Sequence, residues 1–544
     1  MGKYVRAPQR KGGNKRVVII LSVVAILLVA VIAVTGFLAI RYHIIDAKFY
    51  PKDSEILDLR GQEIQPGHFE KLSQKMPDCE IRWDIPFQGG ILADDVKEIT
   101  LTDLSVKDIE MLSYARQLKT VYVKDYTGYE TLTMLRQQYP ELKVVYDVTF
   151  SGGSFPWDVE TLQLNSVTQE DVQLLKHLPN LKTVVLGSGS HDAQTAEALQ
   201  AAVHNAGAQF AMTIGGATYL DTETALQISG VTDEDLQMLQ FATALETLEL
   251  HNPKADPQRI FALRESLPNA AVTWEVTLGD QTFDETATQV DLTMVEVTDL
   301  AEVEQKLAYL PNLEQVTFGL CGVDNANWGN SRSKLTASAI ENEDMAAYRD
   351  RVRDNYKVVW TVRLGPSIAL ATDADNFMPN HFGVGQLPDS YAYNLRYCEE
   401  MVCLDVGHMT LTDISFVEFM PNLKYLILAW TEVQYIEPIR SCKNLVFLEL
   451  DNSCIRDISP LVDCTALEDL NLGNTFVDVT PILGMTWLKN VYFIYGSPSS
   501  AYKFSQAVPT ARVVASGDAT VGGGWRRLPN YYAMRDCLNA PYMN

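Results

Sequence analysis

Hydrophobic positions recur at a fixed interval between residues 401 and 496. Short apolar strands return every 22 residues, and a fifth follows one residue early: Leu404-Asp405-Val406, Leu426-Ile427-Leu428, Leu448-Glu449-Leu450, Leu470-Asn471-Leu472 and Val491-Tyr492-Phe493. Four of these strands have a leucine three residues before them, at Leu423, Leu445, Leu467 and Leu488. Self-similarity at a fixed period predicts a solenoid, in which stacked coils share one core because a single coil cannot close its own.

This block resembles the leucine-rich repeat family in its bacterial, internalin-type form, with the spacing L-x-x-L-x-L-x-x-N-x-I-x-D-I-x-P-L. The best copy is 445–461. Where the family places Asn, the chain has Met409, Thr431, Ser453, Thr475 and Gly496. Hydroxyl side chains can still bond the turning backbone, so we expect irregular coils only at the two ends. The resemblance implies a parallel sheet on the concave side and I-x-x-I-x-P turns on the convex side.

A longer and more diverged repeat of about 63 residues precedes this block. Three coils of about 21 residues make one unit, whose third strand is rich in aromatic residues, as at Trp83, Tyr146, Trp274 and Trp360. Thr168 and Thr232 each stand three residues before an acid and ahead of an apolar run, which predicts helix starts. Further helices are expected at 129–138, 193–204, 257–267 and 341–352. The region therefore reads as the same solenoid with helices on its convex side.

These patterns predict an α/β fold: a leucine-rich-repeat solenoid with a curved parallel sheet and with helices and 3-10 turns on its convex side, preceded by one transmembrane helix. The expected divisions are a basic tail (1–16), a transmembrane signal-anchor helix (17–40), a spacer (41–54), diverged repeats (55–318), an irregular insertion (319–395), 22-residue repeats (396–515) and a cap or tail (516–544).

The anchor prediction rests on charge and length. Residues 1–16 hold six basic residues and no acid, and 17–40 carry no charge over 24 residues. About 20 apolar residues span a bilayer, and the basic flank favours a cytoplasmic N-terminus with the repeat domain outside. A cleaved signal peptide is the alternative. Its apolar region normally covers about 7–15 residues before a small-residue site, for which Ala33-Val34-Thr35 is the nearest match.

Charge narrows the class of partner. Beyond residue 45 the chain has 37 basic and 69 acidic residues, a formal charge of −32. Such a surface disfavours nucleic acid and anionic lipid and favours a basic protein or peptide. No C-x-x-C, H-E-x-x-H, G-x-S-x-G or phosphate loop occurs, and Asp373-Ala374-Asp375 lacks the Gly and Glu of a calcium loop. We therefore expect no cofactor, no metal and no enzyme activity.

The eight cysteines are too sparse for a disulfide framework. Cys442 and Cys464 occupy the same repeat position, which holds Met420 and Met485 in neighbouring coils. Two interpretations are open at this point: buried thiols that replace apolar side chains, or a disulfide between adjacent coils. The absence of Cys-rich end caps, which are common in secreted eukaryotic repeat proteins, favours a bacterial source.

The candidate ligand surface is the concave face. Alternation along a strand turns the Leu residues inward, so the residues between them face a ligand. In successive coils, the candidate ligand-binding residues at these positions are Asp405, His408, Ile427, Trp430, Glu449, Asp451, Asn471, Tyr492, Ile494 and Tyr495. Aromatic residues are favoured binding anchors. The alternative is that they pack against the insertion or the tail. In the diverged repeats, the aromatic residues of the third strands lie beside an aliphatic residue that also repeats. We therefore expect these aromatic residues to be buried in the core.

The first functional hypothesis is an extracellular protein-binding or adhesion-type module, tethered to a bacterial membrane. A structural scaffold of the cell envelope without a tight ligand is the alternative, and an enzyme with its site in 319–395 is a remote third. The insertion is either a joint between repeat classes or a binding flap. The tail is either a strand that caps the solenoid or an exposed interaction peptide.

Overall fold

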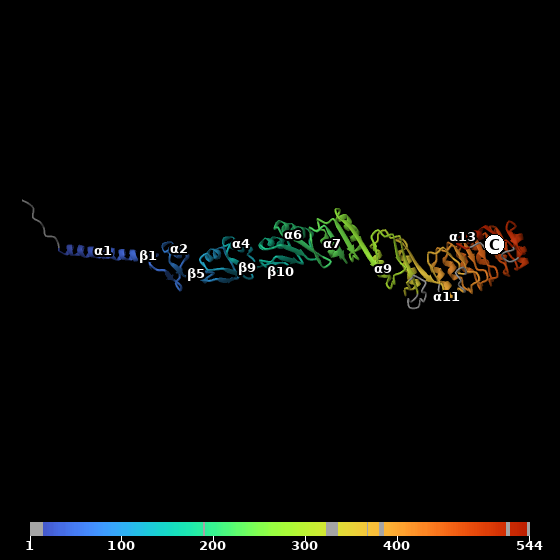
Figure 1. The fold of residues 1–544 in the computed structure, drawn as a ribbon, viewed down its shortest axis with the longest axis horizontal. Helices are drawn as coiled ribbons and strands as arrows, with labels where there is room; N and C mark the ends of the chain where they lie inside the picture. The colour runs from blue at the N-terminus through green and yellow to red at the C-terminus, as the bar shows by residue number, and fades with distance from the viewer. Residues whose placement is uncertain are drawn as a thin grey trace, which may run out of the picture. The chain divides into compact units, whose positions relative to one another are not determined.

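The computed structural model describes residues 15–188, 191–322, 336–366, 368–379, 386–517 and 523–540 (Figure 1). Most of the predicted basic tail and of the polar loop after residue 322 therefore lies outside the described residues. The chain divides into two compact units. The first holds Met1–Glu223 with Phe241–Thr243, and the second holds Thr224–Gln240 with Ala244–Asn544.

The first unit begins with an apolar helix, α1 (Lys15–Arg41). Its segment Ile19–Arg41 is long and apolar enough to cross a membrane, and none of it is buried by the rest of the chain. At 1.5 Å per residue it is about 35 Å long, which matches a hydrocarbon core of about 30 Å. An antiparallel hairpin of β1 (Tyr42–Ile45) and β2 (Lys48–Pro51) follows directly.

The diverged repeats fold as modules, each with its own sheet. A short first module pairs β3 (Ile56–Asp58) with β4 (Glu80–Arg82) around α2 (Pro66–Lys75) and ends in the hairpin of β5 (Asp84–Phe87) and β6 (Gly90–Ala93). Four longer modules follow, each of them running strand, helix, strand, helix, strand, strand. In all four the first three strands are parallel and the fourth is antiparallel.

Two of these modules lie in the first unit. Their elements are β7 (Glu98–Leu101), α3 (Val106–Leu112), β8 (Thr120–Val123), α4 (Tyr129–Gln138), β9 (Lys143–Phe150) and β10 (Gly153–Pro156), then β11 (Thr161–Leu164), α5 (Gln169–Leu174) with η1 (Leu175–His177), β12 (Thr183–Leu186), α6 (Ala193–Asn205), β13 (Gln209–Ile214) and β14 (Ala217–Leu220).

The other two begin the second unit. Their elements are β15 (Ala225–Ser229), α7 (Asp233–Leu239), β16 (Thr247–His251), α8 (Pro257–Ser266), β17 (Ala271–Leu278) and β18 (Gln281–Asp284), then β19 (Gln289–Leu292), α9 (Leu300–Leu307), β20 (Gln315–Leu320), α10 (Asn342–Val352), β21 (Lys357–Arg363) and β22 (Ala369–Ala371). Part of the predicted insertion is therefore regular, because α10, β21 and β22 complete the last module.

Local sequence explains the helix starts. Thr168 and Thr232 each accept a hydrogen bond from the backbone N–H three residues on, while Asp171 and Asp235 bond back to the cap, forming capping boxes. Both predicted starts are confirmed, as are the four predicted helices, which match α4, α6, α8 and α10 within one residue at each end. The fourth, antiparallel strand of each module was not predicted.

The aromatic column of the third strands is core, as predicted. Trp83, Tyr146, Trp274 and Trp360 are all buried. The Nε1 atom of Trp274 donates to the backbone oxygen of Tyr309 at 2.7 Å, and Trp360 donates to Asn342 Oδ1 at 3.0 Å. These rings fill the modules that contain them and present no stacking platform to a ligand.

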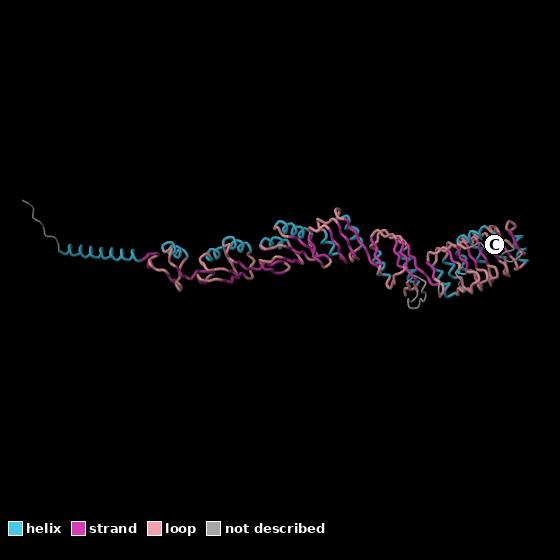
Figure 2. Tube along the Cα trace, in the orientation of Figure 1, coloured by secondary structure: helices cyan, strands magenta, loops and turns pink. Residues whose placement is uncertain are grey.

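The 22-residue repeats have the leucine-rich repeat fold (Figure 2). Seven parallel strands follow one another in sequence order: β23 (Asn376–Phe377), β24 (Cys403–Asp405), β25 (Tyr425–Ile427), β26 (Phe447–Glu449), β27 (Asp469–Asn471), β28 (Asn490–Tyr492) and β29 (Arg512–Val514). Leu404, Leu426, Leu448 and Leu470 are in register and fully buried. They form the shared core that the repeat predicts.

Short helical turns return the chain on the convex side. They are α11 (Asp389–Ala392) with η4 (Tyr393–Tyr397), then η5 (Ser415–Phe419), η6 (Glu437–Ser441), η7 (Ser459–Asp463), η8 (Thr480–Ile482) and α12 (Pro498–Ala507). The last coil is closed by α12 and β29, where Phe504 packs on Phe493 with ring centroids 6.2 Å apart.

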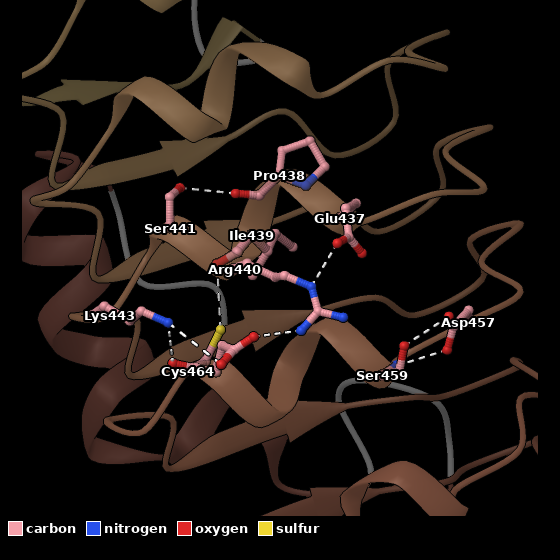
Figure 3. A network of polar contacts seen from close by, with 10 residues as sticks. Glu437, Pro438, Ile439, Arg440, Ser441, Lys443, Asp457, Ser459 and Cys464 are labelled. Carbon is pink, nitrogen blue, oxygen red and sulfur yellow. Dashed lines mark hydrogen bonds and ion pairs between the residues drawn. The ribbon is translucent and has the colours of Figure 1, made fainter.

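Polar contacts join neighbouring turns of the convex side (Figure 3). Arg440 Nε donates to Glu437 Oε1 at 2.6 Å, and the same guanidinium reaches Asp463 in the next coil. The Asp457 carboxylate accepts from the backbone N–H and the hydroxyl of Ser459, both at 2.8 Å, and so opens η7. The Cys464 thiol donates to the Ile439 carbonyl at 3.5 Å. Cys442 and Cys464 are both buried free thiols, so the buried-thiol interpretation is the correct one.

Candidate functional site: the concave face and its rim

The concave side of the C-terminal block (396–515) is covered by the chain's own C-terminus. Six of the ten predicted ligand residues are buried in the structure: Ile427, Glu449, Asp451, Asn471, Tyr492 and Ile494. Asp405 is half-buried, while His408, Trp430 and Tyr495 are exposed. The prediction that all ten line an open surface is therefore wrong for the six. Residues 523–540, here called the C-terminal segment, contact four of them: Ile427, Tyr492 and Ile494 in a shared apolar cluster, and Glu449 through a hydrogen bond.

The C-terminal segment is helical rather than a capping strand or an exposed peptide. It consists of η9 (Trp525–Arg527) and α13 (Pro529–Cys537). Its apolar side chains join those of the concave strands in one buried cluster that includes Ile427, Phe447, Tyr492, Trp525 and Tyr531. Both sequence interpretations of the tail are thus corrected. The aromatic and leucine side chains of the segment pack against the apolar residues of the concave strands, Ile427, Tyr492 and Ile494.

Trp525 is the centre of this contact. Its side chain is 0% exposed. Its ring stacks on Phe447 with centroids 4.5 Å apart and meets Tyr492 edge-on at 5.1 Å. Its Nε1 atom donates a hydrogen bond of 2.8 Å to Glu449 Oε2. One side chain therefore provides both apolar contact and the donor for a buried carboxyl group.

Charges are complementary across this contact. Burial raises the pKa of Glu449 to about 7, although the hydrogen bond from Trp525 opposes the shift. Burial also raises the pKa of Asp405, and the nearby positive charges of Arg535 and Arg526 lower it in part. Arg535 is itself buried and donates to Met378 Sδ at 3.6 Å. The acidic concave face thus holds a segment that is aromatic and basic.

The rim of the same sheet remains open. One residue per coil, three positions after the strand ends, has a left-handed backbone with φ between 49° and 62°: His408, Trp430, Asn452, Asn474 and Tyr495. Asn adopts this conformation at little cost, whereas a bulky ring does so rarely. Thr431, Ser453 and Thr475, which follow it, each donate a hydroxyl hydrogen bond to a carbonyl three residues earlier at 2.7 Å, as the resemblance implies.

Four exposed rings lie along the rim. Trp430 is 54% exposed and Tyr495 is 63% exposed, and His408 stacks on Trp430 with centroids 5.7 Å apart. Phe476, two residues after Asn474, is 77% exposed. Sequence reasoning missed Phe476 because it lies outside the strand columns. Phe476 lies two residues after the repeat position that Trp430 and Tyr495 occupy in their own coils, and this spacing could have been used to identify it. We call His408, Trp430, Phe476 and Tyr495 the aromatic rim.

Within the described residues, no group of three or more His, Cys, Asp or Glu side chains could hold a metal ion. The chemistry of both surfaces is therefore that of apolar contact, hydrogen bonding and charge complementarity.

Comparisons with known proteins are distant. No protein-family model and no curated protein matches the chain. Among solved structures, an internalin (InlF) of Listeria monocytogenes is similar at 14% identity, covering 55% of this chain and 83% of its own, with a TM-score of 0.22. A leucine-rich repeat protein of Leptospira interrogans is similar at 14% identity, covering 76% and 92%, with a TM-score of 0.24. The leucine-rich repeat fold described above rests on strand register and coil geometry.

Proposed function

We propose that this leucine-rich repeat chain is a protein-interaction module, tethered to a bacterial membrane by α1, that binds another protein through its aromatic rim. The observation that carries the proposal is the left-handed backbone of His408, Trp430 and Tyr495. Strained conformations of bulky residues persist where they are useful, and they cluster at binding sites. Two other coils have Asn at this position, Asn452 and Asn474. The scaffold therefore accommodates the residue that adopts a left-handed backbone at a lower free-energy cost.

The exposed rings supply the contact surface. Neighbouring parallel strands lie about 4.8 Å apart, so Trp430 and Tyr495, three strands apart, are about 14 Å apart along the stack. That distance fits about four residues of an extended partner segment. Aromatic side chains contribute large contact area at low entropic cost. The excess of acidic residues favours a basic partner.

The membrane location is part of the proposal. Basic residues before α1 and its uncharged length support an N-terminus in the cytoplasm and a repeat domain outside the cell. The proposal includes no catalysis, no cofactor and no nucleic acid. A structural scaffold of the envelope is the second candidate. It is favoured by the burial of six concave residues, four of which contact the chain's own C-terminal segment.

A partner-capture experiment tests the proposal. Full-length protein in detergent is compared with the double variant Trp430→Ala/Tyr495→Ala, using cross-linking and mass spectrometry of the captured proteins. We expect one partner to be lost at least tenfold in the variant, because two anchors are removed. Tyr435→Ala/Tyr502→Ala is the matched control, since both tyrosines are 68% exposed and lie off the rim. Equal capture by both double variants would exclude the rim, and the scaffold would become the better assignment.

A stability measurement separates strain from binding. Trp430→Asn places at the rim the residue found at 452 and 474. We expect the free energy of unfolding to change by no more than about 1 kcal/mol, because Asn tolerates the left-handed backbone while the hydrogen bond between the Trp430 side chain and Asp451 is lost. Partner capture is expected to fall at the same time. Chemical denaturation measures the first effect, and a loss of stability beyond 1 kcal/mol would show that Trp430 is structural.

A further inference from the structure

Two cysteines meet where the C-terminal segment lies on the concave sheet. Cys403 begins β24 and is fully buried. Its Sγ atom lies 3.5 Å from the backbone oxygen of Met534 in α13. Cys537 follows Met534 by three residues, about one helical turn, and packs against the same buried cluster as Cys403. The two thiols are within hydrogen-bonding reach of each other.

The other cysteines differ from this pair. Cys442 and Cys464 donate to backbone carbonyls of the neighbouring coil, and Cys454 is exposed on the rim side of its coil. Cys403 and Cys537 instead join the sheet to a segment that is far away in sequence. A covalent bond between them would connect two parts of the chain that otherwise touch only through non-covalent contacts.

The two thiols have unequal reactivity. The hydrogen bond from Cys403 lowers the pKa of Cys537, and the positive charge of Lys424 contributes to the same shift. Burial strongly raises the pKa of Cys403. Cys537 is also partly exposed, whereas Cys403 is not. A thiolate is the attacking form in thiol–disulfide exchange, so Cys537 reacts first and Cys403 resolves the product.

We propose that Cys403 and Cys537 form a disulfide that fixes the C-terminal segment over the concave face, with a low-molecular-weight disulfide such as oxidised glutathione as the oxidant. The Cys537 thiolate attacks one sulfur of the oxidant, forms a mixed disulfide and releases one thiolate. Cys403 then loses its proton to solvent and attacks Cys537 Sγ, forming the intramolecular bond and releasing the second thiolate. Two cysteine thiols are oxidised and one small disulfide is reduced to two thiols.

The bond has a defined consequence for the binding surfaces. In the oxidised protein the concave residues that the segment contacts stay covered, and the aromatic rim is open to a partner. In the reduced protein the segment is held by non-covalent contacts alone, so it opens more often. The inference requires neither the rim nor the membrane location of the proposed function.

Peptide mapping tests the pairing. Full-length protein in detergent is equilibrated with oxidised glutathione, alkylated and digested without reduction. We expect the main cross-linked species to join the peptides of Cys403 and Cys537. In the Cys403→Ser variant we expect glutathione to remain attached to Cys537, because the resolving thiol is gone. Cys454→Ser, which removes an exposed cysteine, is the matched control and is expected to leave the pairing unchanged.

Hydrogen exchange provides the second measurement. Backbone amides of 525–537 are expected to exchange at least tenfold more slowly in the oxidised protein than in the reduced protein, and Cys537→Ser is expected to abolish this difference. A dominant cross-link between other cysteines, a stable glutathione adduct on Cys537 in the wild type, or equal exchange in both redox states would each overturn the proposal. Partner capture by the rim is expected to be the same in Cys537→Ser and wild type, so a failure here is distinct from a failure of the proposed function.

Discussion

Replacing Trp525 by alanine is expected to release the C-terminal segment from the concave face. The variant loses a fully buried ring that stacks on Phe447 and Tyr492, and it leaves the Glu449 carboxyl group without its indole donor. Truncating a buried Trp costs about 3–5 kcal/mol. Leaving a buried acceptor unpaired costs about 1–3 kcal/mol and is included in such values. We expect amides of α13 to lose hydrogen-exchange protection while β24–β28 keep theirs.

Tyr435→Ala is the control for this experiment. It removes an aromatic side chain from the same block, but from a position that is 68% exposed. Exposed substitutions usually change stability by less than about 0.5 kcal/mol. Equal protection of α13 in wild type and Trp525→Ala would show that the segment does not depend on this ring. Loss of protection in the strands as well would show that the segment and the sheet unfold as one unit.

Repetition made the C-terminal block predictable. The 22-residue period sets the position of every inward leucine, and one coil determines the next because each strand pairs only with its neighbours. The helix starts at Thr168 and Thr232 were predictable for a similar reason, since a capping box involves only four consecutive residues. Features that depend on local sequence or on a repeat were therefore read correctly.

The antiparallel fourth strands of the longer modules were not predicted because their sequence pattern is weak. Their segments, such as Gly153–Pro156 and Gln281–Asp284, are short and mostly exposed or half-buried, so they lack an apolar alternation. The turns before them did contain a usable signal. Gly215-Gly216 and Gly279-Asp280 are two-residue links between strands, and Gly216 and Gly279 have a positive φ, as tight hairpins require. Because of these hairpins, each module has a separate sheet.

The prediction of an open ligand-binding surface was wrong for a different reason. Strand alternation correctly placed Glu449, Asn471 and Tyr492 on the concave side, but alternation cannot say whether a distant part of the chain covers that side. The contact between Trp525 and Glu449 spans 76 residues, and no repeat relates them. Two features of the sequence were informative in retrospect: the apolar side chains Ile427, Tyr492 and Ile494 in the columns, and the aromatic residues of the tail.

The buried carboxyl group of Glu449 should make the attachment of the C-terminal segment dependent on pH. With the segment in place, burial raises the pKa of Glu449 from its ordinary value of 4.5 to about 7. The covered state therefore binds the proton more strongly than the open state does. Its stability is highest below about pH 4.5, falls as pH rises towards 7 and is constant above that. The difference amounts to about 3 kcal/mol.

Neighbouring groups modify this dependence without reversing it. Burial also raises the pKa of Asp405, which faces Arg526 and Arg535 of the segment, so it acts in the same direction as Glu449. The positive charge of Arg526 opposes the shift of Glu449. Asp457 on the convex side has a lowered pKa because Ser459 donates to it, so it should contribute no slope between pH 4.5 and 8. Asp457→Asn is therefore a suitable control.

Glu449→Gln removes the titrating group and keeps an oxygen that accepts the hydrogen bond from Trp525. We expect the variant to hold the segment about as well as wild type near pH 4.5 and more strongly at pH 8, by about 3 kcal/mol. Hydrogen exchange of 525–537 across this pH range measures the effect, after correction for the intrinsic pH dependence of exchange. If hydrogen exchange of the segment depended on pH in the same way in wild type and Glu449→Gln, the carboxyl group would be solvated when the segment is bound. A residual slope in the variant is expected from Asp405, and it should be smaller than that of wild type.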